Sequence, residues 1–214
     1  MSLAWLKVQL RCIRCFGKPY ESCKERVLKL LETKEEWVKV NGGHVKVKLI
    51  AGNGDCLFSA FIHQYLRTKE KTTTPRSRSV EQQRPIEVGE LRRQVSNFLA
   101  EKRGDPILEH AMTATIEEDP NYITWQREST DATDGFIRSL SLAKERIFGG
   151  EETIFALARI YRVRIRIFHE RGNDVVYGEE YQKEVRLCYR YDRDIRLHYD
   201  SVIETQLKKS KNRD

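Results

Sequence analysis

Two short segments hold residue types that could work together as a nucleophile and its base. Cys56 follows the turn signal at residues 53–55 and opens the stretch Cys56–Leu66, whose apolar residues recur at helical spacing. The first turn of a helix presents unpaired N–H groups and the positive end of the helix dipole, which stabilise a thiolate and can face a developing oxyanion. The sequence therefore predicts a cysteine nucleophile at the start of a helix.

The candidate base is His198, in the segment Leu197–Val202, whose pattern predicts a strand. Side chains two apart on a strand share a face, at about 6.5 Å between Cα atoms, so Asp200 can reach the imidazole. A carboxylate bonded to one ring nitrogen fixes the tautomer and leaves the other nitrogen to take a proton. With Cys56, this pattern is typical of a cysteine hydrolase. Taken singly, Cys56 also fits a small buried residue, and His198 fits a hydrogen-bonded structural one.

Helical and strand patterns surround these two segments. A turn at 41–43 joins the predicted strands 37–40 and 44–50 into a hairpin. Polar composition predicts a mobile insertion at 68–84 and an acidic loop at 115–135. Further helices are expected at 91–99, 136–148 and 151–161, and further strands at 163–167, 185–189 and 195–202. This order predicts an α+β fold with a small central β-sheet flanked by helices.

Three segments resemble the ovarian tumour (OTU) cysteine proteases. Residues 53–60, Asn-Gly-Asp-Cys-Leu-Phe-Ser-Ala, resemble the nucleophile box of that family, Asp-Gly-Asn-Cys-Leu-Phe-Arg-Ala. Residues 198–202, His-Tyr-Asp-Ser-Val, resemble its C-terminal His-Tyr-Asn/Asp-Ser-Val. Residues 148–151, Phe-Gly-Gly-Glu, are similar to its Trp-Gly-Gly segment. The three segments occur in the order of the family, and the resemblance covers roughly residues 45–203.

The OTU resemblance implies a papain-like α+β fold and a thiol protease that hydrolyses the (iso)peptide bond after the C-terminus of ubiquitin or a ubiquitin-like modifier. By position, Cys56 would be the nucleophile that forms a thioester, His198 the general base and then acid, and Asp200 the residue that orients His198. The backbone N–H groups of the oxyanion hole would come from the loop of Asn53, Gly54, Asp55 and Cys56. The implied partners are ubiquitin or ubiquitin-like conjugates, and no metal or organic cofactor is implied.

The nucleophile box departs from the family pattern at two positions. The usual Asp three residues before the cysteine is Asn53, which can hydrogen-bond and hold the loop but carries no charge. Asp55 could cap the helix, yet its charge beside Cys56 would oppose thiolate formation. These departures keep open a catalytically weak OTU-like module that binds ubiquitin. The basic residues at the end of the chain also leave open a cysteine protease that processes a polyprotein.

Four further residues could contact a substrate. Glu117 and Glu118 belong to an acidic segment that could face the basic tail of ubiquitin, and Trp125 follows closely. A solvated loop explains the same residues equally well. Tyr199, beside His198, could line the channel for the narrow Gly-Gly tail or simply pack in the interior.

Composition limits the remaining possibilities. The chain has 214 residues, a net charge of +7 and five Cys. We expect an OTU-like domain at 41–204, an N-terminal extension at 1–40 and a basic tail at 205–214. No apolar run approaches the roughly 20 residues that span a bilayer, and we expect no signal peptide. Few cysteines, in odd number, fit a reduced environment, so we expect a cytoplasmic or nuclear monomer.

Charge and cysteine spacing indicate no second type of partner. The basic residues are spread along the chain and no nucleic-acid-binding motif accompanies them, so neither nucleic acid nor a membrane is expected as a partner. Cys12, Cys15 and Cys23 lack a nearby fourth ligand for tetrahedral zinc. We therefore expect no metal site.

Overall fold

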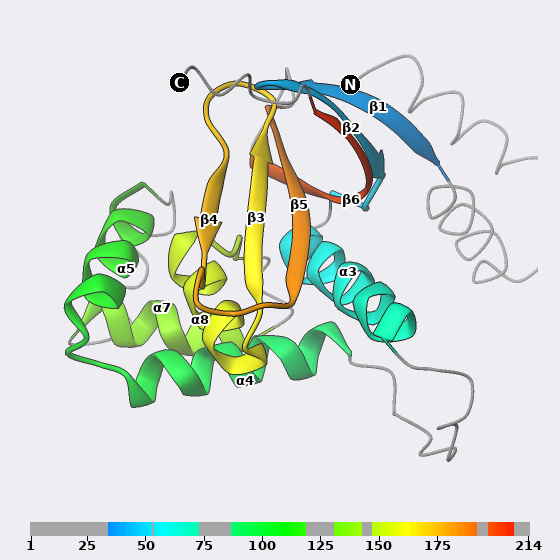
Figure 1. Cartoon of the computed structure of the whole chain (residues 1–214). Coiled ribbons are helices and arrows are strands. Elements are labelled where there is room, and N and C mark those ends of the chain that lie inside the picture. Colours follow the sequence, from blue (N-terminus) through cyan, green and yellow to red (C-terminus); the bar gives the residue numbers. More distant parts are fainter. Residues whose placement is uncertain are drawn as a thin grey trace, which may run out of the picture.

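A mixed β-sheet forms the centre of the molecule. The computed structural model describes residues 34–52, 54–72, 87–118, 131–142, 147–191 and 197–207. Six strands in this part form one sheet in the order β1-β2-β6-β5-β3-β4 (Figure 1). The strands are β1 (Glu35–Val40), β2 (Gly43–Lys48), β3 (Arg164–His169), β4 (Val175–Tyr177), β5 (Glu184–Tyr191) and β6 (Leu197–Leu207). Neighbouring strands are antiparallel, except that β3 and β5 are parallel.

Helices flank this sheet. Within the described residues they are α3 (Cys56–Thr72), α4 (Val88–Glu101), α5 (Pro106–Glu118), α7 (Ala132–Ser141) and α8 (Glu151–Tyr161). α3 packs against β5 and β6, while α8 packs against β3 and β4. α4 and α5 each pack against α7 and α8, and these helices form the lower part of the molecule in Figure 1. The predicted α+β fold with a sheet flanked by helices is therefore confirmed.

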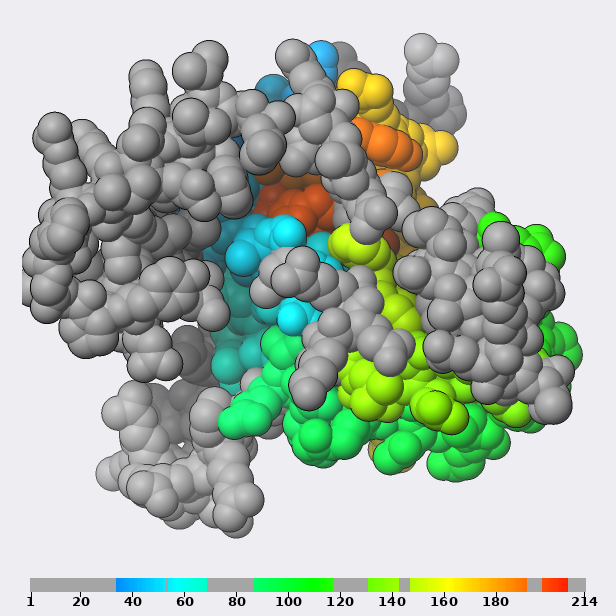
Figure 2. All heavy atoms as spheres, turned by 180° about the vertical axis from the view of Figure 1, so that it is seen from behind, coloured from blue at the N-terminus to red at the C-terminus, as the bar shows by residue number. Residues whose placement is uncertain are grey.

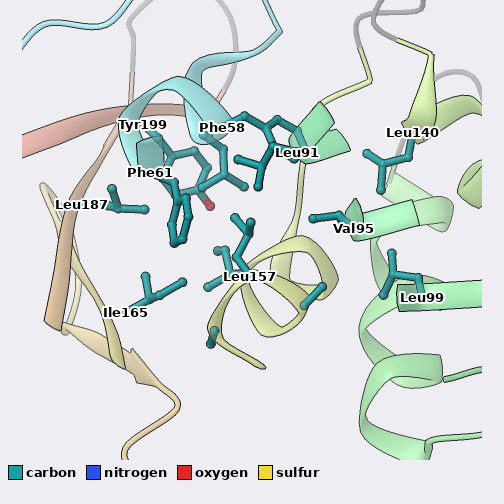
Figure 3. Close-up of a cluster of buried hydrophobic side chains, with 14 of the residues drawn as sticks. Phe58, Phe61, Leu91, Val95, Leu99, Leu140, Leu157, Ile165, Leu187 and Tyr199 are labelled. Carbon is teal, nitrogen blue, oxygen red and sulfur yellow. The ribbon is translucent and has the colours of Figure 1, made fainter. Parts of the chain in front are cut away.

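Strand alternation divides the buried apolar side chains into two clusters. The larger cluster joins the helices to one face of the sheet, and Figure 3 shows Phe58 and Leu157 from the helices beside Ile165 and Leu187 from the strands. The next residues along the strands point to the other face. There the smaller cluster joins Phe168, Cys188 and Val202 to the valines of the β1–β2 hairpin. The hairpin, which continues the sheet beyond β6, thus adds its valines to a second apolar cluster, separate from the one that joins the sheet to the helices.

The sequence pattern missed one helix and misplaced the ends of two others. α5 includes residues 115–118, which were predicted as loop. Its buried Leu108, Met112 and Ile116 recur four residues apart, which is the spacing of one helix face. α7 ends at Ser141 rather than near residue 148, and residues 147–150 have no regular secondary structure. α3 continues to Thr72, into the predicted insertion, whose residues 73–84 lie outside the described part.

The sheet extends past the predicted domain boundaries at both ends. β1 begins at Glu35 and pairs with β2. Its Val38 and Val40 are buried in the smaller cluster, which makes this strand part of the domain. β6 continues to Leu207. Residues 1–33, which include Cys12, Cys15 and Cys23, lie outside the described residues, as do residues 192–196, where the predicted strand 195–202 begins, and residues 208–214. None of the described helices is long and apolar enough to cross a membrane.

Candidate active site

Cys56 is the first residue of α3. The chain enters this helix through Gly54, whose φ of +89° is a conformation that a residue with a side chain rarely adopts. The carbonyl of Asp55 accepts a hydrogen bond from the Ser59 N–H at 2.9 Å, which starts the helix immediately before the cysteine. The first-turn N–H groups therefore face out of the helix end beside the sulfur, as predicted from the sequence.

His198 and Asp200 lie on one face of β6. His198 Nε2 is 3.0 Å from Asp200 Oδ1. Because an ionised carboxylate only accepts hydrogen bonds, Nε2 is the protonated nitrogen that donates to it, and Nδ1 remains for a second partner. A Cβ placed on Gly52 would lie 3.6 Å from Nδ1, so the exposed backbone of Gly52 lies against this edge of the ring.

The second partner of the His198 imidazole is the Cys56 sulfur, which hydrogen-bonds to it. Burial alone would lower the pKa of His198. Hydrogen bonds to the Asp200 carboxylate and the Cys56 sulfur outweigh burial and raise that pKa to about 10. At neutral pH the ring therefore favours the imidazolium form, which is the partner that a thiolate needs.

The Asp200 carboxylate is fully buried and has three partners. Its Oδ1 also accepts a hydrogen bond from the Ile50 N–H at 2.7 Å, and its Oδ2 accepts one from Arg190 Nη1 at 3.2 Å. Arg190 pairs directly with His198 across the β5–β6 register, and the same nitrogen lies 2.6 Å from Glu36 Oε1. These partners hold the carboxylate in one orientation toward the imidazole.

A buried hydroxyl fixes α3 to β6 and so fixes Cys56 relative to His198. Ser201 Oγ lies 2.6 Å from His63 Nδ1 and accepts a hydrogen bond from Gln64 Nε2 at 2.8 Å. Gln64 Nε2 also donates to the Val202 carbonyl at 2.6 Å. The face seen in Figure 2 shows the result: the cyan start of α3 lies beside the orange-red β6 and the yellow-green segment that leads into α8.

Asp55, the acidic neighbour of Cys56, forms an ion pair. Arg92 of α4 donates from Nε to Asp55 Oδ1 at 2.8 Å, and its Nη2 lies 2.7 Å from the same oxygen. The Arg92 side chain is completely buried. The negative charge that the sequence analysis expected to oppose the thiolate is therefore balanced by a cation within the protein.

The structure places the other predicted site residues as follows. Tyr199 is 8% exposed and belongs to the larger cluster beside Phe58 and Phe61, a placement that favours packing over a role in lining a channel (Figure 3). Glu117 is exposed near the end of α5. Asn53, Trp125 and the side chain of Glu118 lie outside the described residues.

The three central side chains can carry out covalent hydrolysis. A sulfur at a helix start can attack a carbonyl carbon, the adjacent imidazolium can protonate a leaving amine, and the carboxylate can keep the imidazole in place. Cys188 lies outside this group, and burial raises the pKa of its thiol to about 12. Within the described residues, no three His, Cys, Asp or Glu side chains group as metal ligands would.

The sequence model of the family described as OTU-like cysteine protease matches residues 51–204, a range that contains Cys56, His198 and Asp200. The chain belongs to the OTU-like cysteine protease family. The family resemblance drawn from three short segments is thus confirmed over most of the chain. The mixed sheet with flanking helices is the OTU fold of this protein.

Solved structures of OTU domains are similar to this OTU protein at low sequence identity. An OTU domain in complex with ubiquitin is 13% identical with a TM-score of 0.44, and the match covers 78% of this chain and 75% of that one. An OTU deubiquitinase from Wolbachia pipientis wMel bound to ubiquitin is 11% identical with a TM-score of 0.47, and the match covers 79% and 96% of the two chains. No sequence among the curated proteins matches this chain.

Sequence reasoning missed Arg92 and Arg190, which bind the two acidic residues of the site. Arg92 lies on another helix, 37 residues after Asp55, and Arg190 lies on the strand next to that of Asp200. No local sequence motif therefore links either arginine to its partner. One signal was available for Arg92, which shares a helix face with Val95 and Leu99, three and seven residues later. An arginine on an apolar face indicates a buried partner of opposite charge.

Proposed function

We propose that this OTU protein is an active deubiquitinase that hydrolyses the (iso)peptide bond after the C-terminus of ubiquitin or a ubiquitin-like modifier. The observation that carries the proposal is the contact of the Cys56 sulfur with an imidazole whose other nitrogen faces a buried carboxylate. Membership of a cysteine protease family supports the same reaction. Ubiquitin is the modifier to test first, because the OTU resemblance implies it.

The reaction follows from the positions of these groups. The Cys56 thiolate attacks the carbonyl carbon of the modifier's last residue, and the oxyanion that forms faces N–H groups at the start of α3. The His198 imidazolium gives the leaving amine a proton, the C–N bond breaks and a thioester remains. Water then attacks the thioester while His198 accepts its proton, which releases the carboxylate and regenerates Cys56. Asp200 orients the imidazole through both steps.

The side of approach follows from exposure. Cys56 is only 2% exposed, whereas the His198 side chain is 20% exposed and the neighbouring Gly52 is exposed. A peptide end therefore reaches the pair from the side of Gly52 and His198. The absence of a side chain at Gly52 suits a narrow, extended tail there.

The ion pair of Asp55 favours an active enzyme over a catalytically weak ubiquitin-binding module. The weak alternative is motivated by the charge of Asp55 beside the nucleophile. Arg92 lies 2.7 Å from that carboxylate and opposes its charge.

Electrophilic probes test the proposal. The protein is incubated with ubiquitin and ubiquitin-like proteins that carry a C-terminal electrophile, and the adduct is located by peptide mass spectrometry. We expect one covalent adduct on Cys56 with at least one modifier, and none with Cys56→Ala. Cys56→Ala should keep its thermal midpoint within a few degrees, because it removes one sulfur atom. Labelling by none of the probes would overturn the assignment.

A further inference from the structure

Arg92 of α4 joins the loop before the nucleophile to two other parts of the chain. Besides its contacts with Asp55, its Nη2 donates to the Gly54 carbonyl at 2.9 Å and to the Ile147 carbonyl at 3.0 Å. Its Nη1 donates to the Leu140 carbonyl at 3.2 Å. All three guanidinium nitrogens therefore have partners, as a fully buried arginine requires.

These contacts fix the position of the turn that precedes Cys56. The Gly54 carbonyl and the Asp55 carboxylate are held by the same guanidinium, which itself lies 4.5 Å from the centre of the Phe58 ring. Phe58 is two residues after Cys56 and completely buried. The cation is thus bound to the chain on both sides of the nucleophile.

The charged groups around Cys56 show which charge Arg92 balances. His198 and Tyr199 approach the sulfur from β6, with Asp200 behind His198, and Glu152 of α8 lies near Tyr199. Burial raises the pKa of both Tyr199 and Glu152, which favours their neutral forms. The Asp55 carboxylate is the acidic group next to Cys56 in the chain, and Arg92 is the cation bound to it.

We propose that Arg92 is a positioning residue of this active site, which holds the Gly54–Asp55 turn and cancels the Asp55 charge beside the Cys56 thiolate. The inference rests on the proposed function only for its role in turnover. Lysine would not replace arginine here, because a single ammonium cannot reach the Gly54, Leu140 and Ile147 carbonyls and the Asp55 carboxylate together.

The pH dependence of Cys56 alkylation tests the electrical part and needs no ubiquitin. Reaction with iodoacetamide is followed from pH 5 to 10 by mass spectrometry of the Cys56 peptide, which excludes signal from the other cysteines. Arg92→Gln removes the buried cation that binds the Asp55 carboxylate, so we expect the alkylation midpoint to rise by about one pH unit. Asp55→Asn leaves the guanidinium unopposed, so we expect the midpoint to fall. The double variant should return toward the wild-type midpoint.

A neighbouring arginine supplies the matched control. Arg93 is exposed and pairs with Glu90 on the same helix. Arg93→Gln removes the same charge one residue away and should leave the alkylation midpoint unchanged. If Arg92→Gln does not fold, Asp55→Asn alone decides, because its carboxylate is partly exposed and its isosteric amide keeps an acceptor for Arg92.

The outcomes separate this inference from the proposed function. If the role of Arg92 were merely structural, Arg92→Gln would lower the thermal midpoint and leave the pH midpoint of Cys56 alkylation unchanged. That result would overturn the proposal. Turnover of a ubiquitin C-terminal amide supplies the second measurement, in which Arg92→Gln should lower kcat at least tenfold with a smaller change in KM. Shifted midpoints without turnover by the wild type would contradict the deubiquitinase assignment and leave the role of Arg92 intact.

Discussion

The hydrogen bond between Asp200 and His198 raises the pH up to which His198 stays protonated. The raised pKa of His198, at about 10, keeps the imidazolium available as general acid at neutral pH. This charge state depends on the Asp200 carboxylate, because burial alone would shift the pKa downward. The residue that orients the base therefore also determines the pH range of the reaction.

Asp200→Asn tests this dependence. The amide can still accept a hydrogen bond from Nε2, but it lacks the charge that favours the imidazolium. We expect the alkaline limb of the kcat/KM profile to move to lower pH by about 1–2 units, because the imidazolium is then lost sooner as the pH rises. An alkaline limb in the same place as in the wild type would show that the carboxylate charge has no such role.

At the scale of elements, the site depends on the fixed position of α3 against β6. Ser201 is completely buried and contacts His63 and Gln64 at once. Ser201→Ala leaves buried polar partners unsatisfied, so we expect a loss of about 1–3 kcal/mol in the free energy of unfolding. Urea denaturation measures this loss, and kcat should fall with it.

Ser141→Ala is the control for that experiment. Its hydroxyl donates to the Arg138 carbonyl at an exposed helix end, at 2.6 Å. We expect a change below about 0.5 kcal/mol. Equal losses for the two serine variants would contradict the role assigned to Ser201.

A buried carboxyl stabilises the segment that leads into α8. Glu152 is completely buried and accepts hydrogen bonds from the Gly150 N–H at 2.9 Å and from the Thr115 and Thr153 hydroxyls, each at 2.7 Å. Burial nevertheless raises the pKa of this acid. Glu152 therefore contributes fully to stability below its pKa in the unfolded chain, near 4.5. This contribution is lost as the pH rises through its higher pKa in the folded protein.

Glu152→Gln should consequently gain stability relative to the wild type as the pH rises. We expect the wild type to be the more stable protein at pH 4, with the difference shrinking or reversing by pH 8. Urea titrations of both proteins at several pH values measure the difference. A difference that is constant with pH would mean that Glu152 keeps an ordinary pKa.

Regular periodicity made most helices and strands predictable from the sequence, whereas contacts between distant segments could not be predicted from it. The pattern of residues 151–161 gave the bounds of α8, and alternation located β3, β5 and β6. α5 was missed because the acidic, polar residues at its end are typical of a loop, although Leu108, Met112 and Ile116 recur at the four-residue spacing of one helix face. The grouping of Cys56, His198 and Asp200 was predicted from residue types and strand spacing, and the family resemblance implies the same three roles. Arg92 and Arg190 depend on packing that no short motif encodes.

At the scale of the whole molecule, the sheet separates two apolar clusters that hold the site from both sides. The smaller cluster ties the β1–β2 hairpin to the strand that carries His198 and Asp200. Phe168→Ala removes a side chain that is 1% exposed in this cluster, so we expect a loss of about 3–5 kcal/mol by urea denaturation. Trp37→Ala, on the same hairpin but 44% exposed, should cost less than about 1 kcal/mol. A small loss for Phe168→Ala would mean that the hairpin adds little to the stability of the domain.

Trapping the covalent intermediate tests the central claim most directly. The protein is mixed with a ubiquitin C-terminal amide, quenched with acid during turnover and analysed by intact and peptide mass spectrometry. The account predicts a ubiquitin thioester on Cys56 that hydroxylamine cleaves, and neither adduct nor turnover for Cys56→Ala. Turnover that persists in Cys56→Ala, or an acyl adduct on another residue, would contradict it.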